Sequence, residues 1–348
     1  MKVIIVGGCG FIGSNAADRL ASIGWEVTLF DSLVRKGAER NLEWLRSRHH
    51  LRFVQGDIRN EGVVEQALQG ESYDVLLHLA AQVAVTTSVE RPRYDFEVNA
   101  LGTFNVLEAV RTVSPETIVL NASTNKVYGK LALLEERELK TRYEVTGLPL
   151  GVAESQPLDF HSPYGCSKGA AEQYVSDYAR IYKLRTVNFR QSCIYGPRQF
   201  GVEDQGWVAW FAIAHTVGLP VKLYGTGKQV RDLLHVGDLV DCYLRAVDCI
   251  DAVSGMTFNV GGGPANTLSL LELLALLEKR SGRPVDYGFG DWRPGDQPVY
   301  ISDIRQAERL LGWQPQIPVE EGVGGLWDWI QANSDLFEAM PLTTAAVG

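Results

Sequence analysis

The segment Gly7-Gly8-Cys9-Gly10-Phe11-Ile12-Gly13 constrains the fold more than any other part of this chain. It follows an apolar run, Lys2–Val6, and opens a stretch whose apolar residues recur at helical intervals. Glycine permits the tight turn from strand to helix and lets backbone N–H groups approach a pyrophosphate at the helix N-terminus. The sequence therefore predicts a strand, a phosphate-binding turn and a helix of the dinucleotide-binding type.

Apolar runs alternate with helical patterns through the first half of the chain. This alternation is typical of a doubly wound parallel sheet, the Rossmann arrangement of α/β proteins. The predicted strands are Lys2–Val6, Glu26–Phe30, Arg52–Gln55, Val75–Leu79, Thr117–Asn121, Thr186–Arg190 and Thr257–Val260. The predicted helices include Gly13–Ile23, Glu61–Leu68, Asn99–Val113 and Tyr164–Tyr182.

After Tyr195-Gly196-Pro197-Arg198 the alternation gives way to loops and short helices, which indicates a smaller, interleaved C-terminal α/β substrate domain. We expect the dinucleotide-binding domain to comprise residues 1–190 plus about 234–262. The substrate domain is expected to comprise residues 191–233 plus 263–335, followed by a frayed tail over 336–348.

Asp31 ends the second predicted strand roughly 20 residues after the glycine loop, where dinucleotide-binding domains place the acid that bonds the ribose. A carboxylate at this position favours NAD, because it would repel the additional phosphate of NADP. Arg35 and Lys36 leave NADP as the alternative, since both can pair with that phosphate.

Later strand ends complete the predicted cofactor site. Asp57-Ile58 suits an adenine edge, with a helix cap as the equal alternative for Asp57. Asn99 either holds a backbone loop on the nicotinamide side or caps a helix. The predicted cofactor-binding residues are Gly7, Gly10, Phe11, Ile12, Gly13, Asp31, Asp57, Ile58, Leu79, Ala80, Ala81, Gln82, Asn99, Tyr164 and Lys168.

The segment Tyr164-Gly165-Cys166-Ser167-Lys168 brings a phenol and an ammonium together for hydride chemistry. Ser162 is expected to cap a helix that starts at Pro163, and residues four apart share one face of that helix. An unperturbed tyrosine has a pKa of about 10, and ionisation near pH 7 requires about 4 kcal/mol of stabilisation. We expect Lys168 and the helix N-terminus to lower the pKa of Tyr164.

Charge and composition exclude several other classes of protein. The formal net charge is −9, so neither nucleic acid nor an anionic membrane is expected as the main partner. A cytoplasmic location is expected, because no apolar run is long enough to span a bilayer and the start lacks a cleavage pattern. The five cysteines lack the spacing of a zinc or redox motif, and no metal is expected.

Nearly the whole chain resembles the extended short-chain dehydrogenase/reductase family, in particular its nucleotide-sugar epimerases and dehydratases. The resemblance rests on Gly7–Gly13, Asp31, Asp57, Asn99, Ser123-Thr124, Val127-Tyr128-Gly129, Tyr164 with Lys168, Arg190, Tyr195-Gly196-Pro197 and Arg231-Asp232. It implies that Tyr164 is the catalytic base, that Lys168 lowers its pKa and binds ribose, and that Thr124 bonds the reacting oxygen. Such a hydroxyl beside a tyrosinate can steer a proton during hydride transfer, and turn formation is the alternative for Thr124.

The residues after Thr124 distinguish the reactions of this family. Its dehydratases carry an acidic pair there and its decarboxylases a glutamate, whereas this chain has Asn125 and Lys126. The resemblance therefore implies an isomerase: a nucleotide-diphosphate hexose is oxidised transiently to a keto-sugar, and hydride returns to the opposite face. The segments that most resemble epimerases acting at carbon 2 of CDP-hexoses are 123–129, 158–169, 204–208 and 227–232.

Three alternatives to carbon-2 epimerisation remain at this point. They are epimerisation at carbon 4 of a UDP-sugar, a 4,6-dehydration, and a non-catalytic NAD-binding protein. The segment Arg293-Pro294-Gly295-Asp296 is more similar to the wider epimerase family, which leaves the sugar and the nucleotide base open.

Arg231 and Arg293 are the candidates for binding the diphosphate, because guanidinium groups bind phosphate bidentately and the protein is otherwise acidic. With Thr124, Asn125 and Tyr164 they form the predicted substrate site. The resemblance further implies that NAD stays bound through each turnover. It also implies a homodimer or homotetramer that packs through the long helices of the first domain.

Overall fold

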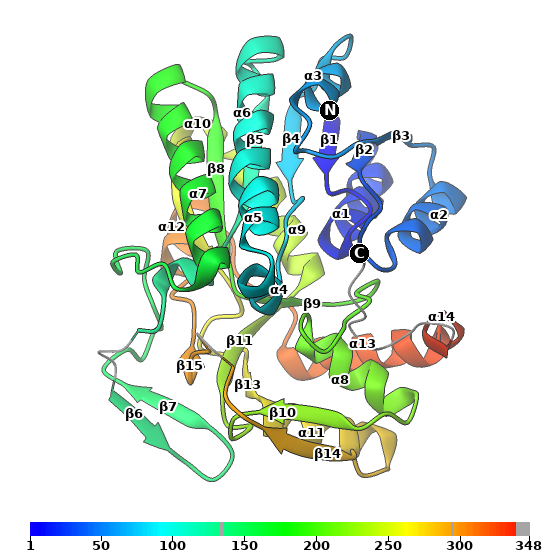
Figure 1. Ribbon diagram of the computed structural model, residues 1–348, viewed down its shortest axis with the longest axis vertical. Coiled ribbons are helices and arrows are strands. Elements are labelled where there is room, and N and C mark those ends of the chain that lie inside the picture. The colour runs from blue at the N-terminus through cyan, green and yellow to red at the C-terminus, as the bar shows by residue number, and fades with distance from the viewer. Residues whose placement is uncertain (132–134, 294–295, 339–348) are drawn as a thin grey trace.

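The computed structural model describes residues 1–131, 135–293 and 296–338, and these form a seven-stranded parallel sheet with the order β12-β8-β5-β4-β1-β2-β3 (Figure 1). The strands are β1 (Lys2–Val6), β2 (Glu26–Asp31), β3 (Arg52–Gln55), β4 (Val75–His78), β5 (Ile118–Thr124), β8 (Thr186–Gln191) and β12 (Thr257–Val260). The predicted doubly wound sheet is confirmed, and the returning strand pairs with β8 at the sheet edge.

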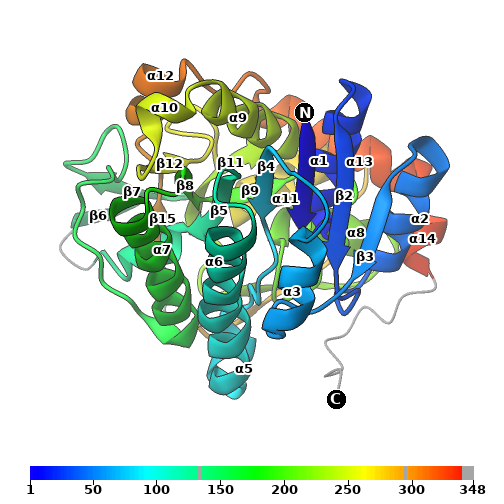
Figure 2. The same cartoon turned by 90° about the horizontal axis from the view of Figure 1, so that it is seen from above.

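Helices cover both faces of this sheet (Figure 2). One face carries α3 (Glu61–Leu68), α6 (Gly102–Val113) and α7 (Ser162–Tyr182), and the short helices α4 (Val85–Glu90) and α5 (Pro92–Phe96) pack against α7. The other carries α1 (Phe11–Ser22), α2 (Ala38–Arg48), α9 (Val236–Asp248), α10 (Ile250–Val253) and α12 (Arg305–Leu311). Val3 and Ile5 pack on the α1 side while Ile4 and Val6 pack on the α6 side, so burial on both faces explains the unbroken apolar run of β1.

The helix predicted over Asn99–Val113 begins earlier than expected. Backbone helical structure runs from Pro92 through α5, a π-helical turn at Glu97–Leu101, and α6. Asn99 therefore lies inside the helix, and the interpretation of Asn99 as an N-cap is wrong. A π-helical turn widens the helix locally and is frequent at functional sites.

Below the carboxyl ends of the large sheet lies a second α/β layer with its own apolar core (Figure 1). Its strands are β9 (Cys193–Tyr195), β10 (Val221–Tyr224), β11 (Val230–His235), β13 (Thr267–Ser269), β14 (Tyr287–Gly290) and β15 (Val299–Tyr300). Its helices are α8 (Trp207–Thr216), α11 (Leu270–Ser281), α13 (Val319–Ala332) and α14 (Asp335–Glu338). Chain from both sides of β12 contributes to this layer, as expected of interleaved units, and the residue limits of the two domains stay a prediction.

A β-hairpin links the two parts of the molecule at the side. It consists of β6 (Glu135–Glu138) and β7 (Tyr143–Thr146), and Tyr143 donates its main-chain N–H to Lys228 at 2.9 Å. Phe337 in α14 is buried, so the first residues of the predicted tail are packed. The rest of that tail, from residue 339, lies outside the described residues.

Candidate active site

The glycine loop between β1 and α1 is packed too closely for side chains. Gly7 has a φ of +86°, and a Cβ on it would lie 2.6 Å from the amide nitrogen of Ala80. A Cβ on Gly13 would lie 2.2 Å from the carbonyl oxygen of Gly7. Among the described residues no side chain caps α1 at Gly10, so the first N–H groups of the helix are open to an anion. The loop therefore fits a pyrophosphate.

Asp31 lies beside the glycine loop at the end of β2. Its carboxylate accepts the N–H of Leu33 at 2.8 Å and the N–H of Cys9 at 2.9 Å. Burial raises the pKa of Asp31, and these two N–H groups oppose the rise. Arg35 and Lys36 are exposed in the following loop. The carboxylate at the strand end supports the prediction of NAD over NADP.

Asp57 and Ile58 follow β3. The Asp57 carboxylate accepts the main-chain N–H of Arg59 at 2.9 Å and pairs with its guanidinium at 2.7 Å. Helix α3 is flanked instead by Asn60, so the interpretation of Asp57 as the cap of this helix is wrong. Ile58 is buried, which leaves Asp57 as the more accessible of the two for an adenine edge.

The main chain after β4 passes close to the glycine loop. Leu79 and Ala80 donate their N–H groups to the carbonyl oxygen of Val6 at 2.7 and 2.8 Å. This pairing holds the small residues of the β4 end against the strand that carries the loop. The remaining predicted contacts at this edge are half-buried: Phe11, Ile12 and Ala81.

Asn99 binds the backbone loop that follows β4, as one of its two predicted interpretations requires. Its Oδ1 accepts the N–H of Gln82 and its Nδ2 donates to the carbonyl of Gln82, both at 2.9 Å. The same Nδ2 lies 3.1 Å from Asp95 Oδ1 and 3.1 Å from Ser167 Oγ. Ser167 Oγ donates to Asp95 Oδ2 at 2.5 Å, and Gln82 Nε2 donates to Asp95 Oδ1 at 2.7 Å. The fully buried Asp95 thereby joins this loop to α7.

Thr124 and Tyr164 meet at the end of β5. The Thr124 side chain hydrogen-bonds the Tyr164 phenol, and Thr124 Oγ1 also accepts the N–H of Lys126 at 3.2 Å. The hydroxyl therefore both starts the 3₁₀ turn Asn125–Tyr128 and contacts the predicted base. Asn125 is buried beside it. Three predicted substrate-site residues, Thr124, Asn125 and Tyr164, are thus brought together.

Helix α7 begins at Ser162, one residue before the predicted start at Pro163. Ser162 has a φ of 68°, and its Oγ accepts the N–H of Gly165 at 3.3 Å. The residue that precedes the helix is His161, so the predicted cap position is off by one residue. The Ser162 hydroxyl nevertheless satisfies a free N–H in the first turn, as a cap would. Tyr164 consequently lies in the first turn of α7.

The pKa of Tyr164 lies above its usual value in this structure, which is opposite to the expected direction. Burial raises the pKa of Tyr164 to about 12, the Thr124 hydrogen bond opposes the rise, and the charge of Asp95 adds to it. The Lys168 ammonium instead donates to the carbonyl oxygen of Ala122 at 2.6 Å. Burial lowers the pKa of Lys168 to about 8, so desolvation outweighs the expected attraction between the two groups.

Arg231 and Arg293 lie near one carboxylate, that of Asp296. Arg231 Nη2 donates to Asp296 Oδ1 at 2.6 Å, and Lys126 Nζ lies 3.9 Å from the same oxygen. Arg293 pairs with Asp204 at 2.8 Å. Burial favours a higher pKa for Asp296, but Arg231 and Lys126 lower it. The structure thus gathers three cations around Asp296, and Lys126 connects them to Thr124 through two peptide bonds.

Asp95 and Ser167 were absent from the predicted site. Ser167 lies within the predicted Tyr-x-x-x-Lys segment, but nothing in its spacing distinguishes it from an ordinary helix residue. Asp95 lies 72 residues away in sequence, and four residues before Asn99 on the same helical stretch. The i, i+4 spacing of Asp95 and Asn99 is the sequence feature that could have indicated that the two side chains lie together on one helix face.

Among the residues that the structure describes, no group of three or more His, Cys, Asp or Glu side chains is arranged to hold a metal ion. In the same part of the chain, no helix combines the length and the apolar character that a membrane span requires.

The parallel sheet, the glycine loop and the Thr124, Tyr164 and Lys168 side chains define a Rossmann-type protein of the short-chain dehydrogenase/reductase class. The chain belongs to the GDP-mannose 4,6-dehydratase family of extended short-chain dehydrogenases/reductases, whose model matches residues 4–325. It is 46% identical to the CDP-paratose 2-epimerase of Salmonella typhi over 334 residues, which are 94% of this chain and 99% of that protein.

Solved structures agree with this assignment. The UDP-glucose 4-epimerase of Thermus thermophilus in complex with NAD has a TM-score of 0.81 and 31% identity, with 96% of this chain and 100% of that chain covered. The dTDP-glucose 4,6-dehydratase of Streptomyces venezuelae with NAD bound has a TM-score of 0.84 and 28% identity, with 99% and 100% covered.

Proposed function

We propose that this protein is an NAD-dependent 2-epimerase of CDP-hexoses, of the CDP-paratose/CDP-tyvelose or CDP-glucose/CDP-mannose type. The observation that carries the proposal is the meeting of Thr124 and Tyr164 beside a turn that holds Asn125 and Lys126. Proton transfer at a sugar hydroxyl needs the first two groups. Elimination of water would need an acid and a base where the amide and the ammonium stand. The 46% identity to a CDP-paratose 2-epimerase supports the same substrate class.

The side chains have separate roles in the proposed reaction. Tyr164 takes the proton from a sugar hydroxyl as tyrosinate while the carbon becomes a ketone, and it returns that proton when the carbon is reduced from the other face. This role requires that the positive charges of the loaded site offset the burial that raises the pKa of Tyr164. Thr124 positions the Tyr164 phenol relative to the reacting oxygen of the sugar. Lys168, fixed by the Ala122 carbonyl, supplies positive charge next to them. NAD, when bound, supplies the hydride chemistry, and the glycine loop and Asp31 are the residues that would hold it.

Lys126, Arg231 and Arg293 lie around Asp296, and we call them the cation cluster. This cluster is proposed to bind the diphosphate of the substrate. Arg231 and Arg293 present guanidinium groups, and the Lys126 ammonium lies close enough to Arg231 to feel its charge. Phosphate oxygens would compete with Asp296 for these cations, because charge-assisted bonds to phosphate are among the strongest available to arginine. This placement sets the sugar between the cluster and Tyr164, with Asn125 beside the sugar.

Incubation with CDP-paratose in deuterium oxide tests the proposal. Direct oxidation at carbon 2 should give CDP-tyvelose without deuterium on carbon, whereas deuterium at carbon 3 would indicate oxidation at carbon 4 followed by enolisation. The Tyr164→Phe protein is the matched control and should give no product while NAD stays bound. Absence of an epimer from CDP-paratose, CDP-glucose and UDP-sugars alike would refute the proposal.

A UDP-sugar 4-epimerase is the second candidate, because a UDP-glucose 4-epimerase from Mycolicibacterium smegmatis is 32% identical over 334 residues. Both reactions use the same three side chains, so the stereochemistry of the product decides between them. UDP-galactose formed from UDP-glucose, with no reaction of CDP-hexoses, would favour this second candidate.

NAD is proposed to remain on the protein through the catalytic cycle. Loss of the reduced cofactor would leave the keto-sugar unreduced, because the same hydride must return to it. Protein purified by gel filtration should therefore carry NAD in roughly stoichiometric amount. A cytoplasmic location is part of the proposal, because all five cysteines are free thiols, as is usual in a reducing compartment.

We further propose a homodimer or homotetramer that packs through α6 and α7. The outer face of α7 exposes Tyr174, Ile181 and Tyr182 by 47%, 57% and 49%, and neighbouring apolar side chains of this size favour a protein partner. Light scattering measures the mass directly. Ile181→Glu should shift the protein toward the monomer, and a wild-type monomer at working concentration would contradict this assembly.

A further inference from the structure

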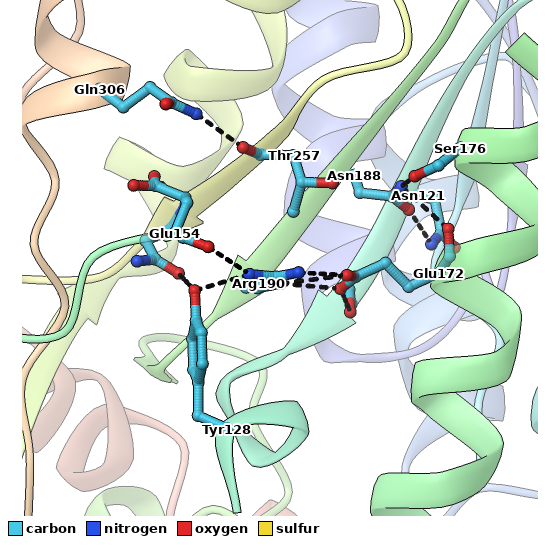
Figure 3. Close-up of polar contacts among 11 residues, drawn as sticks. Asn121, Tyr128, Glu154, Glu172, Ser176, Asn188, Arg190, Thr257 and Gln306 are labelled. Atoms are coloured by element: carbon cyan, nitrogen blue, oxygen red, sulfur yellow. Dashed lines mark hydrogen bonds and ion pairs between the residues drawn. The ribbon is translucent and has the colours of Figure 1, made fainter. Parts of the chain in front are cut away.

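A buried ion pair between Glu172 and Arg190 joins α7 to β8 (Figure 3). Glu172 on α7 is fully buried and Arg190 on β8 is nearly so. Arg190 Nη2 donates to Glu172 Oε1 at 2.6 Å, and Arg190 Nε lies 3.1 Å from both carboxylate oxygens. Replacing such a pair by apolar side chains is often neutral or stabilising. Stability alone therefore gives a weak reason for placing two charges here.

The carboxylate of Glu172 belongs to a regular set of contacts between α7 and β5. Three successive residues of β5 each bind one of three α7 residues that are spaced four apart. The Ala122 carbonyl accepts from Lys168 at 2.6 Å, Ser123 Oγ donates to Glu172 at 2.5 Å, and Thr124 bonds Tyr164. Spacing of four puts these α7 side chains on one face. Glu172 is thus the third tie that fixes the end of β5.

Arg190 extends the same anchorage to the turn that follows β5. Its Nη1 donates to the Tyr128 hydroxyl at 2.8 Å, and its guanidinium lies 4.9 Å from the centre of the Tyr128 ring. The Tyr128 hydroxyl donates in turn to Asn259 Oδ1 at 2.7 Å. Figure 3 shows how Arg190 and Tyr128 lie relative to each other. The turn Asn125–Tyr128 is consequently held at its start by Thr124 and at its end by Arg190.

The charge of Glu172 also acts on Lys168, one helical turn away. The charged and titratable groups that act on Lys168 are Glu172 on α7 and Asp95 on α5, and Lys168 in turn acts on His78 on β4. Burial lowers the pKa of Lys168 to about 8, while Glu172 and Asp95 oppose that decrease. Burial also lowers the pKa of His78 to about 3, so this imidazole is neutral near pH 7.

We propose that Glu172 and Arg190 are positioning residues that hold Thr124 against Tyr164 and place the Glu172 carboxylate one helical turn from the Lys168 ammonium. The inference rests on the proposed epimerase function for its consequence in turnover. Its two structural parts, the anchored β5 end and the charge state of Lys168, can be measured without any substrate.

Glu172→Gln is the primary test, because it keeps the size of the side chain and an acceptor for Ser123 while removing the charge. The Lys168 titration is followed by NMR on protein with labelled lysine, with Lys168→Met to assign the signal. We expect the midpoint to fall by about one pH unit. We also expect kcat to fall by about 10- to 100-fold, as for a small misplacement of reacting groups, with KM nearly unchanged.

Two further variants keep the test decisive. Glu172→Leu combined with Arg190→Met removes both charges, so it should fold even where Glu172→Gln leaves Arg190 unpaired. It should still show the lowered Lys168 midpoint and the lowered kcat. Glu108→Gln is the matched control: Glu108 pairs with Arg111 at 2.7 Å and accepts from the Tyr178 hydroxyl at 2.6 Å, away from Lys168.

The outcomes separate this inference from the proposed function. A Lys168 midpoint and a kcat equal to wild type in the doubly substituted protein would overturn the positioning role. Equal shifts in the Glu108→Gln control would also overturn it, because the effect would then be general to the fold. Wild-type protein that epimerises no nucleotide-sugar but shows the Lys168 shift on Glu172→Gln would contradict the proposed function alone.

Discussion

The Nζ of Lys168 donates a hydrogen bond of 2.6 Å to the main-chain carbonyl of Ala122, two residues before Thr124 on β5. This bond fixes the ammonium to the strand that carries the hydroxyl partner of Tyr164. In this arrangement the ammonium of Lys168 is bound to the Ala122 carbonyl. Lys168 therefore contributes to the proposed reaction through its charge and not through a hydrogen bond to the Tyr164 phenol.

Lys168 should make stability depend on pH in a defined direction. Its pKa falls from 10.5 to about 8 through burial, so between these values the unfolded chain binds more protons than the folded protein. The free energy of unfolding contributed by this group therefore rises with pH across that window. Urea unfolding of cofactor-free wild type and Lys168→Met should show wild type gaining relative stability from about pH 7 to about pH 10. An unchanged difference would contradict the assigned burial effect.

Tyr164 should remain a neutral phenol in protein freed of cofactor. Burial raises its pKa to about 12, so tyrosinate absorbance attributable to Tyr164 should be absent at about pH 9. The measurement is the ultraviolet difference between wild type and Tyr164→Phe during an alkaline titration. An extra tyrosinate in wild type near neutrality would show that the positive charges of the site dominate over burial.

Loss of the Asn99 side chain should weaken both stability and cofactor binding. Asn99→Ala leaves the main chain of Gln82 and the buried Asp95 with fewer partners, which should cost about 1–3 kcal/mol. Chemical denaturation and NAD titration measure the two effects. Asn188→Ala is the control, since it removes a buried amide on β8 that binds Ser176 rather than the Gln82 loop. It should lower stability without lowering NAD affinity.

Gly13→Ala should distort the glycine loop, because the added Cβ would lie 2.2 Å from the carbonyl oxygen of Gly7. We expect NAD affinity to fall about tenfold or more, equivalent to about 1.4 kcal/mol. Gly62→Ala on α3 is the matched control, since its Cβ would meet only Asn60 Oδ1 at 3.6 Å. This control should be stabilising by about 0.4–1 kcal/mol. Equal NAD affinity in both variants would argue against the loop as the pyrophosphate site.

Arg231→Gln should weaken substrate binding while leaving NAD in place. Removal of one charged donor to a phosphate should raise KM by about 10- to 100-fold, with a smaller effect on kcat. Arg180→Gln serves as the control, because Arg180 pairs with Asp177 on the exposed side of α7. A KM unchanged by Arg231→Gln would contradict the proposal that the diphosphate binds at the cation cluster.

Much of the fold followed from local pattern. The predicted strands Lys2–Val6, Arg52–Gln55 and Thr257–Val260 match the observed bounds. For Lys2–Val6 the reason is that a parallel strand buried on both faces is a nearly continuous apolar run. The continuation of helix back to Pro92 was missed, because the polar side chains of Asp95 and Asn99 interrupt the apolar pattern. Both side chains turned out to be buried and bonded to each other.

By itself the sequence determined the class of fold, the glycine loop, the acid at Asp31, and the pairing of Tyr164 with Lys168 on one helix face. All of these depend on spacing along a strand or a helix turn. Only the tertiary structure decided which partners the buried charges take: Lys168 with Ala122, Glu172 with Arg190, and Asp95 with Ser167. It also reversed the expected direction of the Tyr164 pKa shift. The reason is physical, since burial and long-range hydrogen bonds arise only when distant segments pack together.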